Sequence, residues 1–298
     1  MDKLNRAEEL RKQGRYKEAI PLYLEGIREQ RSVLHFFALG DCYEHIGDYS
    51  NAIIYYEKGD KMGNRWASDA LGQIYENGRG TRKDLGKAVK YYERAGVLVP
   101  ACKIGDLYFY GGPGLESDNA KAFMWYNKDN DATSQAMRGF CYLYGYGVSK
   151  DTRKGVEILR AASTSAIALR LLGDCYNDGY GVTKDYSEAF YYYKAAVEHP
   201  YVDEDWRSYK AYGELGRYYI QGYGCVADEK KGFELLKKGA GLGSLHAITL
   251  LGIAYSTGLG TPKDVEKGSY WLNKAIENNY QPAIEARDGL RKHGIPLK

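Results

Sequence analysis

A glycine followed three residues later by a tyrosine recurs along this chain, and this repeat constrains the fold more than any other feature. The repeat glycines are Gly40, Gly72, Gly105, Gly139, Gly173, Gly216 and Gly252. Successive glycines are separated by 32 to 43 residues. A period of this length indicates a solenoid, in which each unit packs mainly on its neighbours. The length of 298 residues therefore reflects the number of repeats rather than the size of one core.

A Gly-x-Gly loop follows the marker in every unit from Gly72 onward, as in YGYGVSKD (144–151) and DGYGVTKD (178–185). A glycine-rich loop with a nearby lysine can hold a phosphate, but such loops follow strands and are not normally repeated along one chain. We interpret these loops as turns in which a glycine ends one helix and an aspartate caps the next. The expected caps are Asp84, Asp118, Asp151, Asp185, Asp228 and Asp264.

Apolar residues between the markers recur at helical spacing. Leu71, Ile74 and Tyr75 fall on one helical face, and Ala88 and Tyr92 fall on one face of the next predicted helix. Each unit is therefore predicted to contain two amphipathic helices.

The whole pattern resembles the Sel-one-like repeat (SLR) family, a branch of the tetratricopeptide (TPR) solenoids. The resemblance rests on an A-x-x-L-G-x-x-Y helix, a G-x-G-v-x-k-D loop and a K-A-x-x-w-y-x-x-A helix, in six units over residues 65–280. Residues 1–64 resemble two ordinary TPR units, whose shorter loop is seen in the 12 residues from Gly40 to Ala52. The resemblance implies an all-α, right-handed superhelical α/α solenoid of tandem helix-turn-helix repeats. Residues 281–298 are expected to form a C-terminal capping helix and tail on one continuous solenoid.

The charge of the chain argues against nucleic acid or a membrane as partner. Lysine and arginine number 42 and acidic residues number 39, which gives a net charge of +3 and no strong global field. The amino terminus, MDKLNRAEELRKQGRYKEA, is highly charged and lacks the apolar core of a secretory signal. A cytoplasmic location is therefore expected, and the odd number of cysteines, five, suits a reducing compartment.

No pattern in the sequence indicates catalysis, a metal, a cofactor or a small-molecule substrate. Cys42, Cys141 and Cys175 each lie two residues after a repeat glycine and are predicted to be core side chains. The five histidines show no metal-ligand spacing, and no motif pairs a nucleophile with a base. The segment DNDATS (129–134) resembles the start of a calcium loop but has Ser134 where that loop requires glycine. We therefore expect no enzyme, although pairing of catalytic groups in space stays open.

The remaining candidate site is the concave surface, which in TPR-type solenoids is lined by the first helix of each unit. By that resemblance, residues at fixed offsets from each repeat glycine should face the groove. The predicted partner-binding residues are Asp41, Glu44, Asp69, Gln73, Asp106, Phe109, Tyr110, Phe140, Tyr144, Arg170, Asp174 and Arg217. An apolar centre between an acidic and a more basic end would suit an extended or helical peptide. The alternative is that Phe140 and Leu143 pack against neighbouring repeats and that the charges form an ordinary solvated face.

The sequence favours a non-catalytic scaffold or adaptor that binds a protein or peptide partner in its concave groove. Two other classes stay open: an enzyme or regulator with an unrecognised active site, and a self-assembling structural solenoid. The oligomeric state is not predicted. The interval after Asp185 is longer than in other units, so residues 199–206, HPYVDEDW, are expected to bulge between helices and to offer a contact loop.

Overall fold

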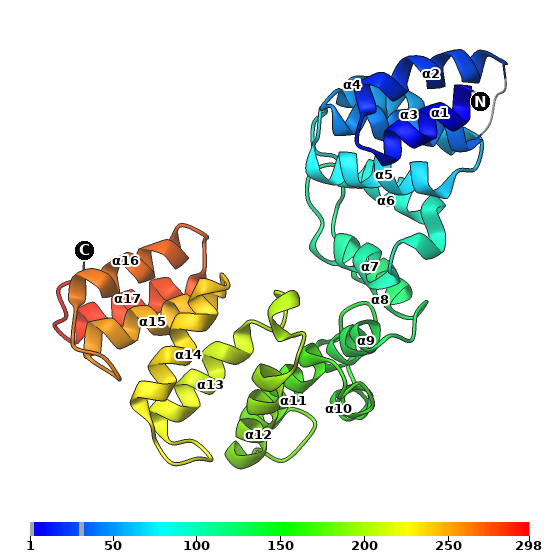
Figure 1. The fold of residues 1–298 in the computed structure, drawn as a ribbon. Helices are drawn as coiled ribbons and strands as arrows, with labels where there is room; N and C mark the ends of the chain where they lie inside the picture. The colour runs from blue at the N-terminus through cyan, green and yellow to red at the C-terminus, as the bar shows by residue number, and fades with distance from the viewer. Residues whose placement is uncertain (1–2, 30–32, 298) are drawn as a thin grey trace. The chain divides into compact units, whose positions relative to one another are not determined.

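The structure, a computed structural model, describes residues 3–29 and 33–297, and over these residues it is built of helices (Figure 1). The predicted all-α solenoid of tandem helix-turn-helix repeats is confirmed. The chain divides into two compact units, Met1–Asp129 and Asn130–Lys298, which are described separately below. No helix in the described part of the chain is long and apolar enough to cross a bilayer.

The first unit contains eight α-helices among its described residues. They are α1 (Lys3–Lys12), α2 (Tyr16–Glu29), α3 (Val33–His45), α4 (Tyr49–Lys61), α5 (Arg65–Asn77), α6 (Leu85–Ala95), α7 (Ala101–Tyr110) and α8 (Asn119–Tyr126). A short 3₁₀ helix, η1 (Gly96–Leu98), connects α6 to α7.

The second unit continues the same helical pattern through its described residues. Its helices are α9 (Ala132–Tyr144), α10 (Thr152–Ala161), α11 (Ala166–Asp178), α12 (Tyr186–Glu198), α13 (Lys210–Gln221), α14 (Glu229–Gly241), α15 (Leu245–Thr257), α16 (Val265–Ile276) and α17 (Gln281–Lys292). The 3₁₀ helix η2 (Val202–Glu204) lies between α12 and α13.

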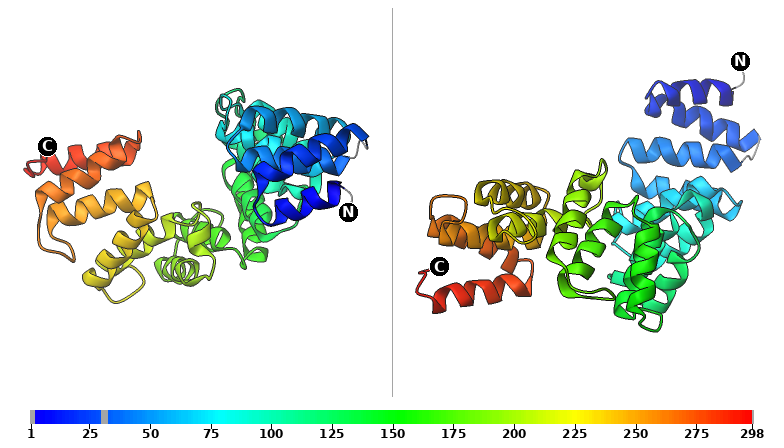
Figure 2. Two further views of the ribbon diagram at one scale, coloured as in Figure 1. Left: turned by 45° about the horizontal axis from the view of Figure 1, so that its top comes forward. Right: turned by 90° about the horizontal axis from the view of Figure 1, so that it is seen from below.

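Within each unit the helices pack in consecutive pairs, one pair per repeat (Figures 1 and 2). The first helices of neighbouring repeats also contact one another, as α9 contacts α11 and α13 contacts α15. Each second helix packs against the first helix of the next repeat, as α14 does against α15. These first helices therefore lie next to one another, and we call the side that they present the inner face; that a partner binds there stays a prediction.

The Gly-x-Gly loops are helix stops and starts, as predicted. Gly78, Gly145, Gly179, Gly222 and Gly258 take the left-handed conformation directly after a first helix. In every such loop the aspartate that begins the second helix accepts backbone N–H groups of that helix's first turn through its side chain. These bonds satisfy N–H groups that would otherwise lack partners.

The second glycine of the loop is required by packing as well as by backbone conformation. Gly181 has a φ of +73°, and a Cβ placed there would lie 2.3 Å from the carbonyl oxygen of Thr152 at the start of α10. Gly224 and Gly260 meet the starts of α12 and α14 in the same way. These three loops therefore dock on the second helix of the preceding repeat, and only glycine leaves room for that contact.

The repeat glycine makes room for a large side chain from the second helix of its own repeat. A Cβ at Gly72 would lie 2.4 Å from the ring of Tyr92, and Gly173 meets Tyr193 at 2.6 Å. In other repeats leucine occupies this place, as Leu236 does against Gly216. The tyrosines at this position are almost fully buried, and they are Tyr56, Tyr92, Tyr126 and Tyr193.

Two further predictions concern the second unit. The segment 199–206 does form an extra connection, but part of it folds inward: Val202 is buried against Ala166 and Tyr212, while Tyr201 and Trp206 are exposed. The C-terminal helix is present as α17, and its Ala283 is fully buried in a cluster with residues of α14, α15 and α16.

Candidate functional site

The acidic residues predicted for the groove of the first unit lie on its first helices, and most of them bind groups of this chain. Asp41 pairs with Arg11 at 2.7 Å, and Glu44 pairs with Arg79 at 3.1 Å. Asp69 accepts a hydrogen bond from Gln73 at 3.0 Å, and burial raises the pKa of its carboxyl group. Two basic side chains of the chain itself, Arg11 and Arg79, therefore offset part of the negative charge of this face.

A second internal contact involves the buried tyrosines of five second helices, α2, α4, α6, α8 and α12, and sequence reasoning missed it. Each donates its hydroxyl to a carboxylate on the first helix of the same repeat. The pairs are Tyr23 with Glu8, Tyr56 with Glu44, Tyr92 with Glu76, Tyr126 with Asp106, and Tyr193 with Asp174. The signal was present in the sequence: repeats with tyrosine on the second helix have an acid on the first helix, and repeats with Leu159, Leu236 or Leu272 have none at the same offsets.

The aromatic residues of the predicted apolar centre fall in two groups, one in each unit. In the first unit Phe109 and Tyr110 contact each other edge to face, with ring centroids 4.9 Å apart, and Tyr110 is 53% exposed. That these two side chains share one binding patch with Phe140 and Tyr144 stays a prediction.

In the second unit four rings form what we call the aromatic cluster: Phe140, Tyr144, Tyr146 and Tyr180. Centroid distances from Tyr144 are 4.9 Å to Phe140, 6.0 Å to Tyr146 and 5.7 Å to Tyr180. Tyr144 is 41% exposed, and Phe140 and Tyr180 pack on the buried core beneath. The cluster offers a flat, rigid and partly exposed apolar surface, and aromatic surfaces of this kind often contribute most of the binding energy at protein interfaces.

Two neighbouring positions show where the core of this repeat lies. Leu143, which the sequence left open between the groove and packing on neighbouring repeats, is 1% exposed and belongs to the core. Tyr142, the marker tyrosine after Gly139, was expected to be a buried packing residue but is only partly buried, and Lys154 lies 4.3 Å from its ring centroid. The core contacts of this repeat are made by Leu143 and Leu159, because Leu159 packs on Gly139 where other repeats have tyrosine.

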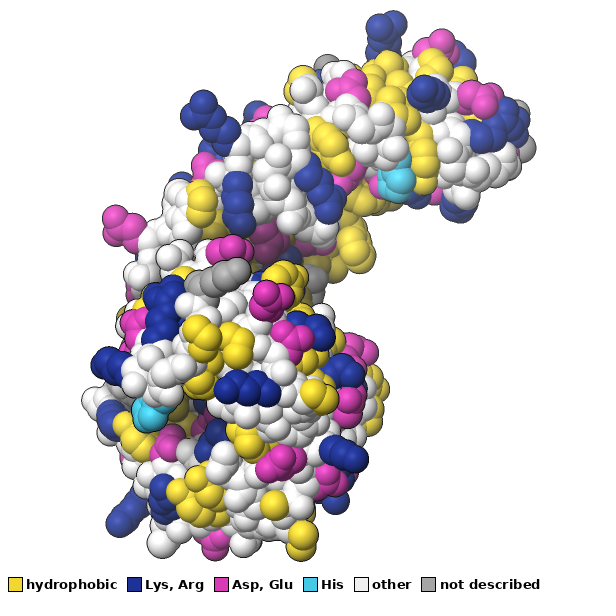
Figure 3. Space-filling view, turned by 90° about the vertical axis from the view of Figure 1, so that its left-hand side faces the viewer, with side chains coloured by type: hydrophobic (Ala, Val, Ile, Leu, Met, Phe, Trp, Pro, Cys, Tyr) yellow, Lys and Arg dark blue, Asp and Glu magenta, His cyan; other side chains and the backbone are white. Residues whose placement is uncertain are grey.

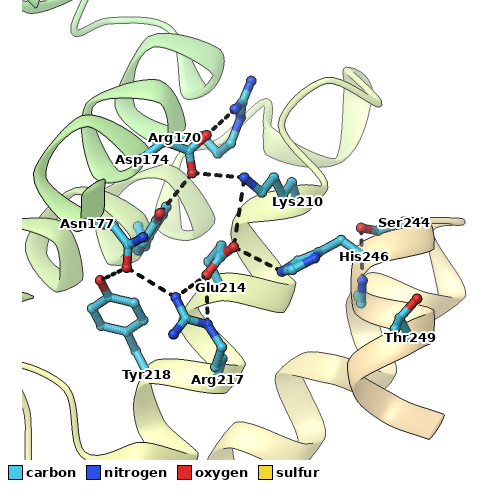
Figure 4. Close-up of polar contacts among 12 residues, drawn as sticks. Arg170, Asp174, Asn177, Lys210, Glu214, Arg217, Tyr218, Ser244, His246 and Thr249 are labelled. Carbon is cyan, nitrogen blue, oxygen red and sulfur yellow. Dashed lines mark hydrogen bonds and ion pairs between the residues drawn. The ribbon is translucent and has the colours of Figure 1, made fainter. Parts of the chain in front are cut away.

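The charged groove residues of the second unit form a connected network across α11, α13 and α15 (Figure 4). Asp174 binds Arg170 at 2.6 Å and Lys210 at 3.2 Å. Arg217 donates to Asn177 at 3.2 Å and to Glu214 at 2.7 Å. The predicted residues Arg170, Asp174 and Arg217 are thus brought together, but Asp174 is only 7% exposed and its two oxygens already bind this chain.

Glu214 is the buried centre of this charged network, and the sequence did not single it out. Its carboxylate lies 3.0 Å from His246 Nε2 and contacts Arg217 and Lys210. Burial opposes the charged form, but His246, Arg217 and Lys210 outweigh it and hold the pKa of Glu214 well below its usual range. The network therefore holds three first helices in register by charge as well as by packing.

Surface charge and the thiols bear on the chemistry that the chain can support. On the face shown in Figure 3, basic and acidic side chains are interspersed with small clusters of hydrophobic side chains.

Burial raises the pKa of the Cys42, Cys141 and Cys175 thiols to about 12, so these thiols stay protonated at neutral pH and act as core side chains, as predicted. Residues 3–29 and 33–297 contain no cluster of acidic, histidine or cysteine side chains able to hold a metal ion.

Comparison with known proteins confirms the resemblance seen in the sequence. A model of the Sel1 repeat matches residues 67–96, 101–128, 132–165, 166–201, 210–244 and 245–280. A tetratricopeptide repeat model matches residues 4–64. No curated protein matches the chain.

Several solved structures are similar to this chain. A Sel1 repeat protein from Oxalobacter formigenes has 27% identity and a TM-score of 0.63, over 80% of this chain and 98% of its own. The C-terminal part of a TPR repeat-containing protein from Cytophaga hutchinsonii has 16% identity and a TM-score of 0.50, over 80% of this chain and 95% of its own. A protective antigen with an SLR fold, present in uropathogenic Escherichia coli strains, has 20% identity and a TM-score of 0.44, over 92% of this chain and 75% of its own.

Proposed function

This chain belongs to the Sel1 repeat family, and from that premise we propose that it is a non-catalytic scaffold that binds a protein or peptide partner on its inner face. Sel1 and TPR repeats commonly form protein-interaction scaffolds. First helices that lie side by side offer one partner segment a contact with several repeats at once. The five free cysteines suit a reducing compartment, so the proposal includes a cytoplasmic location.

The observation that carries the proposal is the aromatic cluster of the second unit. Phe140 and Tyr144 are on α9, a first helix, and Tyr144 keeps 41% of its surface exposed although its neighbours are packed rings. Rigid aromatic side chains lose little conformational freedom when they bind, so they contribute strongly to protein interfaces. The charged groove residues support the proposal less, because most of them already bind groups of this chain.

The proposal is tested by capture of partners from lysate with the full chain as bait, followed by affinity measurement with the recovered protein. Phe140→Ala and Tyr144→Ala should each weaken binding by about 2 kcal/mol, as expected for anchors of this type. Tyr191→Ala is the matched control, since Tyr191 is 62% exposed but lies on the second helix α12.

Thermal melts of the same variants separate binding from folding. If Phe140→Ala lowers stability as much as Leu143→Ala and leaves the affinity of the folded protein unchanged, Phe140 is a core residue and the proposal loses its main support. Light scattering over a concentration series tests the self-assembling alternative, which predicts growth of the particle without any partner.

A further inference from the structure

An apolar pocket of about 300 Å³ opens between α13, α14 and α15 of the second unit. Its apolar lining consists of Ile220, Leu236, Leu250, Ile253, Ala254 and Leu259. Ile220, Leu250 and Ile253 are only partly buried, so apolar surface is open to solvent here. Ile220 lies on α13 and Ile253 lies on α15, and both are first helices of their repeats.

The pocket exists because of the side chain on the second helix. In repeats with a buried tyrosine, as at Tyr193, the ring passes the repeat glycine and its hydroxyl reaches a carboxylate on the first helix. Leu236 occupies the same place against Gly216 but is shorter and carries no hydroxyl. The space that a phenol would fill is left open, and the first helix has Arg217 and Ile220 at the offsets where the tyrosine repeats have an acid.

Arg217 gives the edge of the pocket a positive charge. Its Nε and Nη2 donate to Glu214, and Nη2 also donates to Asn177, but Nη1 has no hydrogen bond to any of the residues that the structure describes. The guanidinium lies 5.1 Å and 5.6 Å from the ring centroids of Tyr218 and Tyr223, which fix its plane. In the surrounding network three cations, Arg170, Lys210 and Arg217, face two carboxylates, so an excess of positive charge lies beside the apolar lining.

We propose that this pocket receives one large apolar side chain of a partner peptide, next to an Asp or Glu side chain of the same peptide that pairs with Arg217 Nη1. The inference rests on the proposed function and specifies the chemistry of one contact between the chain and its partner peptide. A pocket of this size is at the small end of the range of about 300–1,000 Å³ for ligand sites, which suits one or two side chains rather than a whole cofactor. The planar guanidinium is the group best suited to hold a carboxylate at a fixed place.

The experiment selects peptides from a displayed random library on the full chain and measures selected peptides, synthesised with amidated C-termini, by fluorescence anisotropy. Selected sequences should carry a Leu, Ile, Met or Phe within about two positions of an Asp or Glu, since extended residues advance about 3.3 Å each. Ile253→Ser and Arg217→Gln should lower affinity about tenfold or more, as for a central contact.

Two charge variants at the pocket edge avoid any disturbance of the buried network. Gln221 lines the pocket and is exposed. Gln221→Lys should strengthen binding of the acidic peptide and Gln221→Glu should weaken it, each by about two- to fivefold at low salt. Tyr191→Ala should leave binding unchanged.

The outcomes separate this inference from the scaffold function. Three results would overturn the pocket assignment. The selected peptides are basic, they bind only through a free C-terminal carboxylate, or their affinity is unchanged by Ile253→Ser and by both Gln221 variants. If such peptides still depend on Phe140 and Tyr144, the scaffold function stands. If no peptide is selected and the lysate experiment also captures nothing, both proposals are wrong.

Discussion

At the scale of single residues, this chain uses glycine for two different reasons that the sequence alone does not separate. Gly243 needs its φ of +91°, but a side chain there would meet nothing within 4 Å. Gly181 needs both its φ of +73° and the absence of a Cβ, because the Thr152 carbonyl oxygen is so close. A comparison of alanine variants at the two positions therefore measures the loss of stability that comes from steric crowding alone.

We expect Gly181→Ala to destabilise the protein more than Gly243→Ala does. Both variants place alanine at positive φ, which costs roughly 1–2 kcal/mol. Gly181→Ala adds a steric clash, and overpacking of this kind costs about 1–3 kcal/mol more. Urea denaturation followed by circular dichroism gives the difference, and equal losses of stability would show that the loop does not need its close contact with α10.

At the scale of helices, the ion network of α11, α13 and α15 should make the stability of the second unit depend on acid. The pKa of Glu214 is depressed from 4.5 in the folded protein. A depressed carboxyl pKa contributes stability that is present above the unfolded value and is lost as the pH falls towards the folded value. The contribution of Glu214 is therefore complete at neutral pH and declines below pH 4.5.

Glu214→Gln should lower stability at pH 7 by roughly 3 kcal/mol, because it removes the buried carboxylate that Arg217, Lys210 and His246 share. It should also reduce the further loss of stability between about pH 4.5 and pH 2.5, since the variant has no proton to take up at this site. The measurement is the urea midpoint as a function of pH. Glu157→Gln, at an exposed carboxylate on α10, is the control and should keep the wild-type profile. A Glu214→Gln profile parallel to that of the control would contradict the assignment.

The sequence predicted the helices, their caps and their pairing because those features depend on short-range patterns. The loop aspartates and the helix-ending glycines act within one turn, so their spacing is sufficient to place them. The site was predicted less completely. Spacing selected Arg170, Asp174 and Arg217, but it could not show that Lys210 of the next repeat binds Asp174, or that His246 contacts Glu214, the partner of Arg217, because those contacts join separate repeats. Spacing left open whether Leu143 faces the groove or packs against neighbouring repeats, and packing against α10 and α11 buries it while the adjacent Tyr144 stays partly exposed.

At the scale of the molecule, charge is distributed unevenly over the first helices. In the first unit the inner carboxylates outnumber the cations in the ion pairs described for them: the carboxylates are Glu8, Asp41, Glu44, Asp69, Glu76 and Asp106, and the cations are Arg11, Lys12, Arg79 and Lys103. The inner network of the second unit has the opposite excess. A partner that contacts both units would therefore need a basic segment as well as an acidic one.

Asp69→Asn should slow association with a partner recovered from lysate and should leave dissociation nearly unchanged. Asp69 has no ion pair among the contacts described for it, and asparagine preserves its shape and its contact with Gln73. Loss of a charge from such a face changes mainly the association rate, and the change should shrink as salt screens the attraction. Stopped-flow binding at two salt concentrations measures this, with Asp60→Asn as the control because Asp60 already binds Arg94. A change in the association rate that is the same at both salt concentrations would show that Asp69 makes a direct contact with the partner and does not attract it over a distance.

The tyrosine–carboxylate pairs have a consequence for how such a chain can change its length. In the five pairs formed by tyrosines of the second helices, donor and acceptor belong to one repeat, as with Tyr92 and Glu76 or Tyr193 and Asp174. Recombination at the connections between one repeat and the next would move a whole repeat, so its buried tyrosine would stay together with the carboxylate that accepts its hydroxyl hydrogen bond. A crossover between the two helices of a repeat would instead join a tyrosine helix to a first helix built for leucine, and would bury a hydroxyl or a carboxylate with no counterpart, at a cost of about 1–3 kcal/mol. The connections between repeats are therefore the positions at which units can be gained or lost with every one of these tyrosine–carboxylate pairs intact.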